Sequence, residues 1–457
     1  MALAVEFMAQ LEQTFGERYT TNATVRAHHG RDESPYPPMP PEAVVYALST
    51  AEVATLVRAC AAHRVPLIAF GAGSSLEGQV MAPHGGVCVD LSRMQAIVAV
   101  HEDDQCATVE AGVTRLQLNA ALRDRGLFFP VDPGADATLG GMVATRASGT
   151  NALRYGTMRE NVLGLTVVDA QGSVLRTARR AKKSAAGYDL TRLFIGSEGT
   201  LGIVTEVTLK LALQPEAIAA AVCHFASVEG AVRTTIAAIQ AGVPLARCEL
   251  LDEAAVRSVN AYSHLGLRET PLLLLEFHGS RSGLAEHAQA VQEIAREHGG
   301  VDFEWAHTPE ERTRLWTARH KCYFAALQLR PGCRSVTTDV CVPISRLADC
   351  IEQTRADLAG ASFPATLLGH VGDGNFHVQM LIDPDSSRER AEAESINGRL
   401  VHRALAMDGT CSGEHGVGLH KIEFLEAEHG HAAIETMRRI KQALDPLGIL
   451  NPGKMFR

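Results

Sequence analysis

The chain has 457 residues, of which 46% are hydrophobic and 21% are charged. This length predicts two domains, or three, and the composition is typical of a soluble globular protein. The net charge of −9 is spread along the chain, so a nucleic-acid partner is not expected; the basic run at 179–183 is short and favours a solvated loop.

The first eighteen residues predict an amphipathic helix, because apolar residues recur on one helical face. They contain Glu6 and no basic n-region, which differs from a secretory signal. No apolar run approaches the ~20 residues of a transmembrane helix. Ten cysteines occur without a single C-x-x-C, which argues against an iron–sulfur module, a zinc knuckle or a disulfide scaffold. We therefore expect a cytoplasmic protein with free thiols.

The segment 49–52, Ser-Thr-Ala-Glu, has the pattern of a capping box and predicts a helix that ends near His63. The apolar run 65–70 then predicts a buried strand. A glycine-rich loop, 71–79, follows this strand directly.

This loop lacks the G-x-G-x-x-G pattern of nicotinamide-type sites, because Leu76 stands at the third glycine position. It also lacks the Gly-Lys-Ser/Thr of a triphosphatase loop. Backbone N–H groups together with the hydroxyls of Ser74 and Ser75 could still hold a pyrophosphate. A plain surface turn is the alternative for the loop taken alone.

Strands are expected at 97–102 and 107–112, followed by a helix at 114–125 that ends at Gly126. The next segment, 131–156, is rich in Gly, Ala, Ser and Thr and poor in bulky side chains. Either a flexible linker or a wall of small residues against a flat ligand explains this composition. The interspersed apolar residues and the flanking strands favour the wall.

After this wall the pattern changes twice along the chain. A hairpin is expected at 162–177 and a glycine-punctuated set of strands at 187–211. From about 216 to 410 strands alternate with long helices, which is an α+β pattern. The clearest elements of the remaining chain are helices at 228–241, 283–298 and 431–445, and strands at 272–277 and 336–342.

Two short glycine-rich motifs carry the residues best suited to chemistry. The first, GHVGDGNFHV at 369–378, contains His370 and His377, and the second, CSGEHGVG at 411–418, contains Glu414 and His415. Two imidazoles and a carboxylate are a common ligand set for a divalent metal, and a further histidine beside them could move a proton. A turn with ordinary flanking histidines is the alternative.

Four segments together resemble one family: the glycine-rich loop, the small-residue wall, GSEGTLGIVTE at 196–206 and DPLGILNPGK at 445–454. This family comprises the flavin-dependent oxidoreductases of the vanillyl-alcohol oxidase / p-cresol methylhydroxylase fold. GHVGDGNFH and GEHGVG narrow the resemblance to the 2-hydroxyacid branch. This branch includes the cytochrome-type D-lactate dehydrogenases, which the chain resembles most, the glycolate oxidase flavoprotein subunit and D-2-hydroxyglutarate dehydrogenase.

The resemblance implies an α+β, two-lobed flavoprotein of the p-cresol methylhydroxylase type, with an FAD-binding lobe and an α+β cap lobe. The FAD-binding domain would span 1–215 and the cap, or substrate, domain 216–410. Residues 411–457 would return to complete the FAD lobe and the active site.

FAD would be bound non-covalently, because the loop has Ser74 where covalent members of the fold have a histidine. The pyrophosphate would be held by loop residues, namely Gly71, Gly73, Ser74, Ser75 and Gly78. The flavin would be lined by residues of the wall, namely Pro133, Thr138, Gly140, Gly141, Ser148, Gly149 and Tyr155. Ile203 would contact the adenine side, and Asn451 would reach the ring from the C-terminal end.

The resemblance also implies a reaction, the oxidation of a D-2-hydroxyacid by hydride transfer to flavin N5. A divalent metal on His370, His377 and Glu414 (zinc, manganese or iron) would bind the substrate's hydroxyl and carboxylate. His415 would accept the hydroxyl proton, and Arg319 would pair with the carboxylate.

The strand reading Thr337-Thr338-Asp339 lacks the basic residue of members that oxidise a five-carbon diacid. D-lactate is therefore the first expected substrate, and glycolate or a longer D-2-hydroxyacid the second.

The resemblance further suggests a cytochrome or quinone-linked electron acceptor and a cytoplasmic location, or a peripheral one at the inner face of the membrane. A homodimer is compatible with the chain. Two other functions remain open from the residues alone. One is a metal-dependent hydrolase built on His370, His377 and Glu414, and the other is a non-catalytic flavin-binding subunit of a larger complex.

Overall fold

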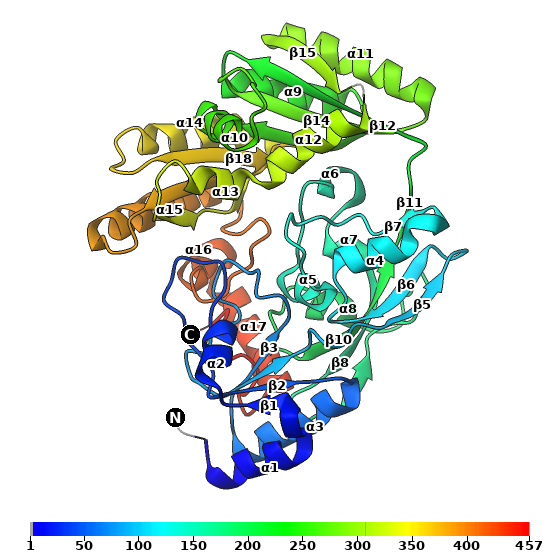
Figure 1. Cartoon of the computed structure of the whole chain (residues 1–457), viewed down its shortest axis with the longest axis vertical. Coiled ribbons are helices and arrows are strands. Elements are labelled where there is room, and N and C mark those ends of the chain that lie inside the picture. Colours follow the sequence, from blue (N-terminus) through cyan, green and yellow to red (C-terminus); the bar gives the residue numbers. More distant parts are fainter. Residues whose placement is uncertain (1–2, 307, 457) are drawn as a thin grey trace. The chain divides into compact units, whose positions relative to one another are not determined.

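The computed structural model describes residues 3–306 and 308–456, which form two compact units (Figure 1). Unit 1 contains the residues up to 148, residues 156–214 and the residues from 414 onward. Unit 2 contains residues 149–155 and 215–413. The sequence-based division did not assign residues 149–155 to the second unit. They belong there because the short helix α6 (Ala152–Tyr155) packs on strand β13 (Leu245–Leu251), where Arg247 Nε donates to Asn151 Oδ1 over 2.6 Å.

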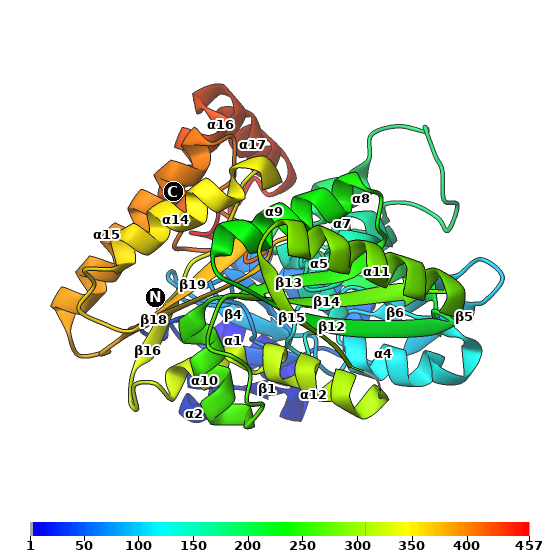
Figure 2. The same cartoon turned by 90° about the horizontal axis from the view of Figure 1, so that it is seen from above.

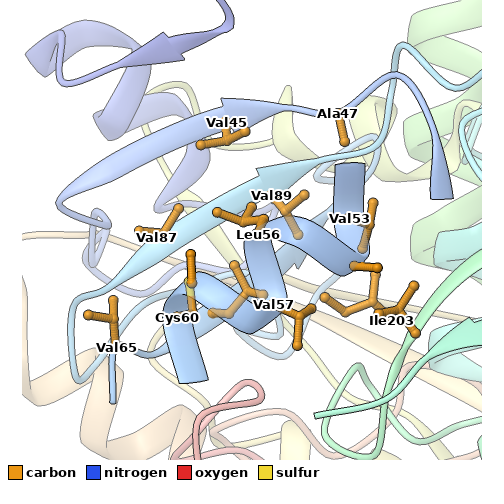
Figure 3. Packing of buried hydrophobic residues seen from close by; sticks show 14 of the residues in the cluster. Val45, Ala47, Val53, Leu56, Val57, Cys60, Val65, Val87, Val89 and Ile203 are labelled. Atoms are coloured by element: carbon orange, nitrogen blue, oxygen red, sulfur yellow. The ribbon is translucent and has the colours of Figure 1, made fainter. Parts of the chain in front are cut away.

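Unit 1 begins with a small sheet in the order β1-β2-β4-β3, in which β2, β4 and β3 are parallel. Helix α3 connects two of these parallel strands, and its buried face packs on the sheet (Figure 3). Figure 3 shows Leu56 and Cys60 of this helix beside Val89 and Val87. The elements are α1 (Val5–Phe15), β1 (Tyr19–Thr20), α2 (Ala23–His29), β2 (Ala43–Tyr46), α3 (Thr50–His63), β3 (Leu67–Phe70) and β4 (Val87–Asp90).

The second sheet of unit 1 is antiparallel, in the order β5-β6-β10-β8-β9. A separate core of buried apolar residues joins this sheet to its helices. Its strands and the small pair β7 and β11 are β5 (Ile97–His101), β6 (Cys106–Glu110), β7 (Leu127–Phe128), β8 (Val162–Val168), β9 (Val174–Arg176), β10 (Ile203–Lys210) and β11 (Ala212–Leu213). The helices of this part are α4 (Arg115–Leu122), α5 (Leu139–Thr145), α7 (Met158–Asn161), α8 (Leu190–Phe194), α16 (Leu425–His429) and α17 (His431–Leu444).

Unit 2 is built on an antiparallel sheet in the order β15-β12-β14-β13-β18-β19-β16, with β17 pairing to β19. Helices α9 and α11 lie along one face of this sheet (Figure 2). Apolar residues of α10, α12 and α13 pack on the other face. The strands are β12 (Ala217–Phe225), β13, β14 (Leu272–Gly279), β15 (Gly300–Ala306), β16 (Arg334–Thr337), β17 (Val340–Cys341), β18 (Ala365–His370) and β19 (Asn375–Ile382). The helices are α9 (Val228–Gln240), α10 (Glu253–Ser263), α11 (Arg281–Glu297), α12 (Pro309–His320), α13 (Cys322–Leu327), α14 (Leu347–Leu358) and α15 (Ser387–Ala406).

Three local predictions were wrong in part. The segment 187–211 contains helix α8 before its strand, since Asp189 caps a helical turn by accepting from Arg192 N. The capping box at 49–52 is only half formed: Ser49 accepts from Glu52 N, but the Glu52 carboxylate pairs with Arg18. The predicted strand at 336–342 divides into β16 and β17 around Thr338 and Asp339.

All ten cysteines lie in the described part of the chain, and none of them forms a disulfide. Within residues 3–306 and 308–456, no helix is long and apolar enough to cross a membrane.

Candidate active site

Unit 1 contains a cavity whose wall joins the glycine-rich loop to the small-residue segment. Most of its lining side chains are small, which leaves a smooth surface suited to a flat ring system. The sequence-predicted cofactor residues on this wall are Gly71, Gly73, Ser74, Ser75, Pro133, Thr138, Gly140, Gly141, Ser148, Ile203 and Asn451. Glu414 and His415 line the same cavity. The predicted cofactor wall and the predicted proton acceptor therefore belong to one cavity of one unit.

Close approach of the backbone explains two glycines of this wall. A Cβ on Gly71 would lie 2.2 Å from Thr138 Oγ1, and a Cβ on Gly140 would lie 2.6 Å from Ala111 Cβ. Larger residues at either position would collide with the opposite side of the wall. The glycines thus bring loop 71–75 against the N-cap of α5, where Thr138 Oγ1 accepts from Gly141 N.

Asp32 fixes the far end of the glycine-rich loop. Its Oδ2 accepts a hydrogen bond from Gly78 N at 2.7 Å and another from Ser75 Oγ at 3.3 Å. Gly78 has a φ of +79° and does not line the cavity, so its position is explained by the turn. The predicted contact of Gly78 with the pyrophosphate stays a prediction.

The GEHGVG segment is held in place by Glu198. This carboxylate is buried and accepts hydrogen bonds from Val417 N at 2.6 Å and Gly418 N at 2.9 Å. Burial raises the pKa of Glu198, although these two backbone donors oppose the shift. Gly416 has a φ of +82°, and a Cβ there would lie 2.5 Å from Glu198 Oε1. The glycines of this motif therefore allow the backbone to wrap a carboxylate.

Asn451 joins three segments of unit 1. Its side-chain amide donates to the Glu198 carbonyl at 2.7 Å and to the Gln79 carbonyl at 3.1 Å. The Gln79 side chain in turn donates to the His415 carbonyl at 2.8 Å. Asn451 also accepts a hydrogen bond from Lys454, whose pKa burial lowers to about 8. The C-terminal LNPGK segment thus holds the backbone around His415.

His415 lies beside a buried ion pair. Its Nδ1 is 3.8 Å from Glu77 Oε1, and the same oxygen is 3.0 Å from Lys421 Nζ. Glu77 and Lys421 are 5% and 3% exposed, so the carboxylate is shielded from bulk water. This arrangement can orient the imidazole and stabilise its protonated form, as a proton acceptor requires.

In unit 2, His370 and His377 come from the adjacent strands β18 and β19. Their ring centroids are 5.5 Å apart and both side chains are buried. His370 Nδ1 lies 2.7 Å from Glu249 Oε1, and His377 Nδ1 lies 3.1 Å from the Thr338 carbonyl. Both acceptors favour the tautomer with the proton on Nδ1, and in this tautomer Nε2 is the nitrogen that carries the lone pair.

Arg319 was predicted to pair with a substrate carboxylate, but within unit 2 it bonds a protein carboxylate. Its Nε and one terminal nitrogen donate to Glu249 Oε2 at 2.9 Å and 2.5 Å. Burial alone would raise the pKa of Glu249, but its neighbours His370 and Arg319 outweigh burial and hold this pKa below its usual value.

Asp339 is a second buried carboxylate near the histidine pair. Its Oδ1 lies 3.8 Å from His377 Nδ1 and accepts from Asn375 Nδ2 at 2.9 Å. Its Oδ2 accepts from Ser412 Oγ at 3.0 Å. Asp339 therefore ties the start of the CSGEHGVG motif to strand β19.

Two predicted flavin-lining residues, Gly149 and Tyr155, belong to unit 2 and are not on the wall of the cavity in unit 1. The Tyr155 hydroxyl lies 2.7 Å from His278 Nδ1, and His278 Nε2 lies 2.8 Å from Glu276 Oε1. This differs from the continuous wall 131–156 that composition predicted. The physical reason is that the chain leaves unit 1 after Ser148 and returns at Gly156.

Family models match most of the chain. The C-terminal domain of FAD-linked oxidases matches residues 214–455, and an FAD-binding domain matches residues 41–178. The chain belongs to the FAD-linked oxidases. It is thus a flavin-dependent oxidoreductase, and this family excludes the metal-dependent hydrolase considered from the residues alone.

Named relatives cover nearly the whole chain. A probable mitochondrial D-lactate dehydrogenase of Danio rerio is 52% identical over 97% of this chain and 90% of its own length. A mitochondrial cytochrome-type D-lactate dehydrogenase of Arabidopsis thaliana is 45% identical, with 99% and 80% covered. Glycolate oxidase subunit GlcD of Bacillus subtilis is 33% identical, with 98% and 96% covered. This FAD-linked oxidase is therefore an enzyme of the group that includes the D-lactate dehydrogenases.

Among solved structures, p-cresol methylhydroxylase with substrate bound has a TM-score of 0.82 at 16% identity, over 98% of this chain and 96% of that one. This likeness confirms the predicted fold class, the α+β flavoprotein of the p-cresol methylhydroxylase type.

Sequence reasoning missed the carboxylates Glu77, Glu198 and Glu249. One signal was available for Glu249: Arg247 and Glu249 alternate within an otherwise apolar strand run, which puts two charges on one face of a buried sheet. Such charges require partners.

Proposed function

We propose that this FAD-linked oxidase oxidises a D-2-hydroxyacid, with D-lactate converted to pyruvate as the first candidate reaction. The observation that carries the proposal is the cavity of unit 1, where His415 and Glu414 share a wall with the small residues suited to a flavin. The names of the relatives at 52% and 45% identity agree with this substrate. The relative at 33% identity supports glycolate oxidation as the alternative, and D-2-hydroxyglutarate is a further one.

The cofactor pocket fits FAD on two grounds. The wall consists mostly of small residues, and Gly71 and Gly140 stand where any Cβ would fill the space or collide. We propose non-covalent binding, because Ser74 occupies the loop position at which covalent members of the fold carry a histidine.

We further propose a divalent metal (zinc, manganese or iron) bound by His370, His377 and Glu414. Two features of unit 2 support it: the histidines are adjacent, and the acceptor at each Nδ1 favours the tautomer whose Nε2 carries the lone pair that a metal binds. Ser412 is bonded to Asp339 beside His377. Since a residue spans at most ~3.6 Å, the Cα of Glu414 can lie no more than about 7 Å from that of Ser412.

When bound, FAD supplies the hydride acceptor at N5, and the metal polarises the substrate's hydroxyl and carboxylate oxygens. The residues of the chain provide position and proton transfer. His415 accepts the hydroxyl proton, and Glu77 stabilises the resulting imidazolium. Lys421 Nζ lies 3.0 Å from the same Glu77 oxygen and holds that carboxylate in place.

Arg319 is the sequence-based candidate for binding the substrate's carboxylate. Its Nε and one terminal nitrogen already donate to Glu249. This role therefore requires its other terminal nitrogen or release of that pair. The preference for a monocarboxylate depends on the segment Thr337-Thr338-Asp339, which supplies no cation for a second carboxylate.

Electrons would leave the enzyme through a cytochrome or quinone-linked carrier, as the name of the cytochrome-type D-lactate dehydrogenase of Arabidopsis suggests. A cytoplasmic location, with peripheral association at the inner face of a membrane, and a homodimer remain predictions. The two D-lactate dehydrogenase relatives are named as mitochondrial, so a mitochondrial location is the alternative.

The decisive experiment is the visible absorption spectrum of the purified protein, recorded anaerobically before and after addition of D-lactate. Samples with L-lactate, glycolate and D-2-hydroxyglutarate run in parallel. Bleaching of the oxidised-flavin band by D-lactate alone supports the proposal. If only glycolate or D-2-hydroxyglutarate bleaches the band, that acid is the substrate in place of D-lactate. A chelator-treated sample tests the metal: the band should remain, bleaching should stop, and added Zn²⁺ or Mn²⁺ should restore it.

A further inference from the structure

A buried carboxylate in unit 2 stands directly across the sheet from one of the proposed metal ligands. Glu249 lies on β13 and His370 on β18, and they are partners in the antiparallel pairing of the two strands. Opposite residues of such a pair point to the same face of the sheet. Glu249 has no exposed surface, and its neighbours in the chain, Cys248 and Leu250, are buried and apolar.

Both oxygens of this carboxylate are engaged, each by a different partner. Oε1 lies 2.7 Å from His370 Nδ1, and Oε2 accepts from Arg319 at 2.9 Å and 2.5 Å. Arg319 comes from helix α12 and is only 7% exposed. The result is a chain of contacts from a buried cation, through a buried anion, to an imidazole.

Such an arrangement is a poor choice for stability alone. Removing two charges from water costs more than most buried ion pairs return, and apolar residues of similar size are often as stable. The cluster beside it is apolar, with Leu251, Leu274 and Leu368 on this face of the sheet. Leucine at position 249 would therefore suit the packing, so packing stability does not explain the buried charge.

The geometry points to a positioning role: we propose that Glu249 holds His370 with its proton on Nδ1 and its Nε2 lone pair toward the metal, while Arg319 balances the charge of Glu249. The inference rests on the proposed metal site. Carboxylates behind metal-binding histidines commonly fix the tautomer and ring orientation, and losing one weakens metal binding ~10–100-fold. Arg319 then acts on the metal site through Glu249 and His370.

A second cluster in the same unit serves as a matched control. His278 Nε2 lies 2.8 Å from Glu276 Oε1, and Arg247 Nε lies 3.4 Å from the same oxygen. This cluster has the same three residue types and similar burial of its glutamate. Its histidine is not a proposed ligand, so a change at Glu276 disturbs a buried charge without touching the metal site.

The test measures binding of Zn²⁺ alone to the metal-stripped, FAD-loaded protein, by competition with a chromophoric chelator. Glu249→Gln should raise the Kd for Zn²⁺ ~10–100-fold. Arg319→Lys should raise it less, because the cation is kept but the paired donors are lost. Glu276→Gln should leave it within about twofold, and His370→Ala should abolish tight binding. Thermal melting of each stripped variant reports whether it is folded.

A Kd for Glu249→Gln within twofold of wild type, while His370→Ala loses Zn²⁺, would overturn the inference and leave the metal site intact. If Glu249→Gln does not fold, Glu249→Asp is measured instead. Aspartate retains the charge, but its shorter side chain withdraws the carboxylate from His370 Nδ1. An unchanged Kd for Zn²⁺ in Glu249→Asp also overturns the inference.

Two further outcomes separate the roles. If Arg319→Lys raises the KM for D-lactate with an unchanged Kd for Zn²⁺, Arg319 is a substrate anchor and its assigned role here is wrong. If wild type itself binds no Zn²⁺ at the concentrations tested, the proposed metal site fails, and this inference with it, whereas flavin bleaching by D-lactate still tests the substrate independently.

Discussion

Replacing Gly71 by alanine tests whether the wall of the cavity is as close as the structure indicates. The new Cβ would lie 2.2 Å from Thr138 Oγ1, 3.3 Å from Thr138 Cβ and 3.5 Å from Thr138 Cγ2. Only the first of these distances is impossible for non-bonded atoms. Thr138 is 4% exposed and its hydroxyl caps α5, so neither side of the contact can move freely. Relieving the collision must displace the loop or the helix.

Overpacking of this kind costs ~1–3 kcal/mol. If the displaced loop no longer matches the cofactor, this energy appears as an FAD Kd raised about 5- to 150-fold, since 1.4 kcal/mol is tenfold. The assay is titration of FAD-free protein with FAD, followed by quenching of flavin fluorescence. Gly398→Ala is the control for the loss of a glycine, because a Cβ there has no neighbour within 4 Å.

A double-mutant cycle makes the reasoning refutable. Thr138→Ala removes the hydroxyl and loses a helix cap, which costs ~1 kcal/mol. In Gly71→Ala/Thr138→Ala the collision is absent, so FAD affinity should be close to that of Thr138→Ala alone, with a coupling of ~1–3 kcal/mol. Wild-type affinity in Gly71→Ala, or strict additivity of the two changes, would show that the loop and the helix are not in contact as described.

Three further predictions concern the proton acceptor His415, the segment held by Glu198 and the buried carboxyl group of Asp252. His415→Ala should retain FAD but lose ~10²–10⁴-fold in turnover, and unchanged rates with D-lactate and its homologues would reject His415 as the base. Glu198→Ala leaves two backbone donors at 417 and 418 without their acceptor, so limited proteolysis should cut within 414–418 sooner than in wild type; equal cleavage times would contradict the tether. Asp252 caps α10, and burial raises its pKa to about 6. The folded state therefore holds this proton more tightly than the unfolded state, and wild-type stability falls as pH rises through about 4 to 6. Asp252→Asn should gain about 1.4 kcal/mol relative to wild type between pH 5 and pH 7.5, seen as a growing difference in Tm; a constant difference would show that Asp252 has an ordinary pKa.

The local features of this protein were predictable from its sequence. Each of these features is a continuous segment that can be recognised from its residue types. They are the glycine-rich loop, the small-residue wall and the two motifs that contain His370, His377, Glu414 and His415. Long helices such as α9 and α11 were also predictable, because their apolar residues recur with the 3.6-residue period of a helix. The strand break at Thr338 and Asp339 was not, since strand-forming residues flank the single Asp339 on both sides.

Contacts between distant side chains were not predictable, because they depend on how the chain folds in three dimensions. Glu249 and His370 are 121 residues apart, and their contact depends on the register of β13 with β18. A shift of one residue would turn Glu249 to the other face of the sheet, and nothing in either strand alone specifies that register. The same holds for Asn451 and Gln79, which are 372 residues apart. Residue types and spacing thus identify the side chains that can bind a ligand or transfer a proton. Strand pairing and the packing of the C-terminal segment in unit 1 determine which residues these side chains contact.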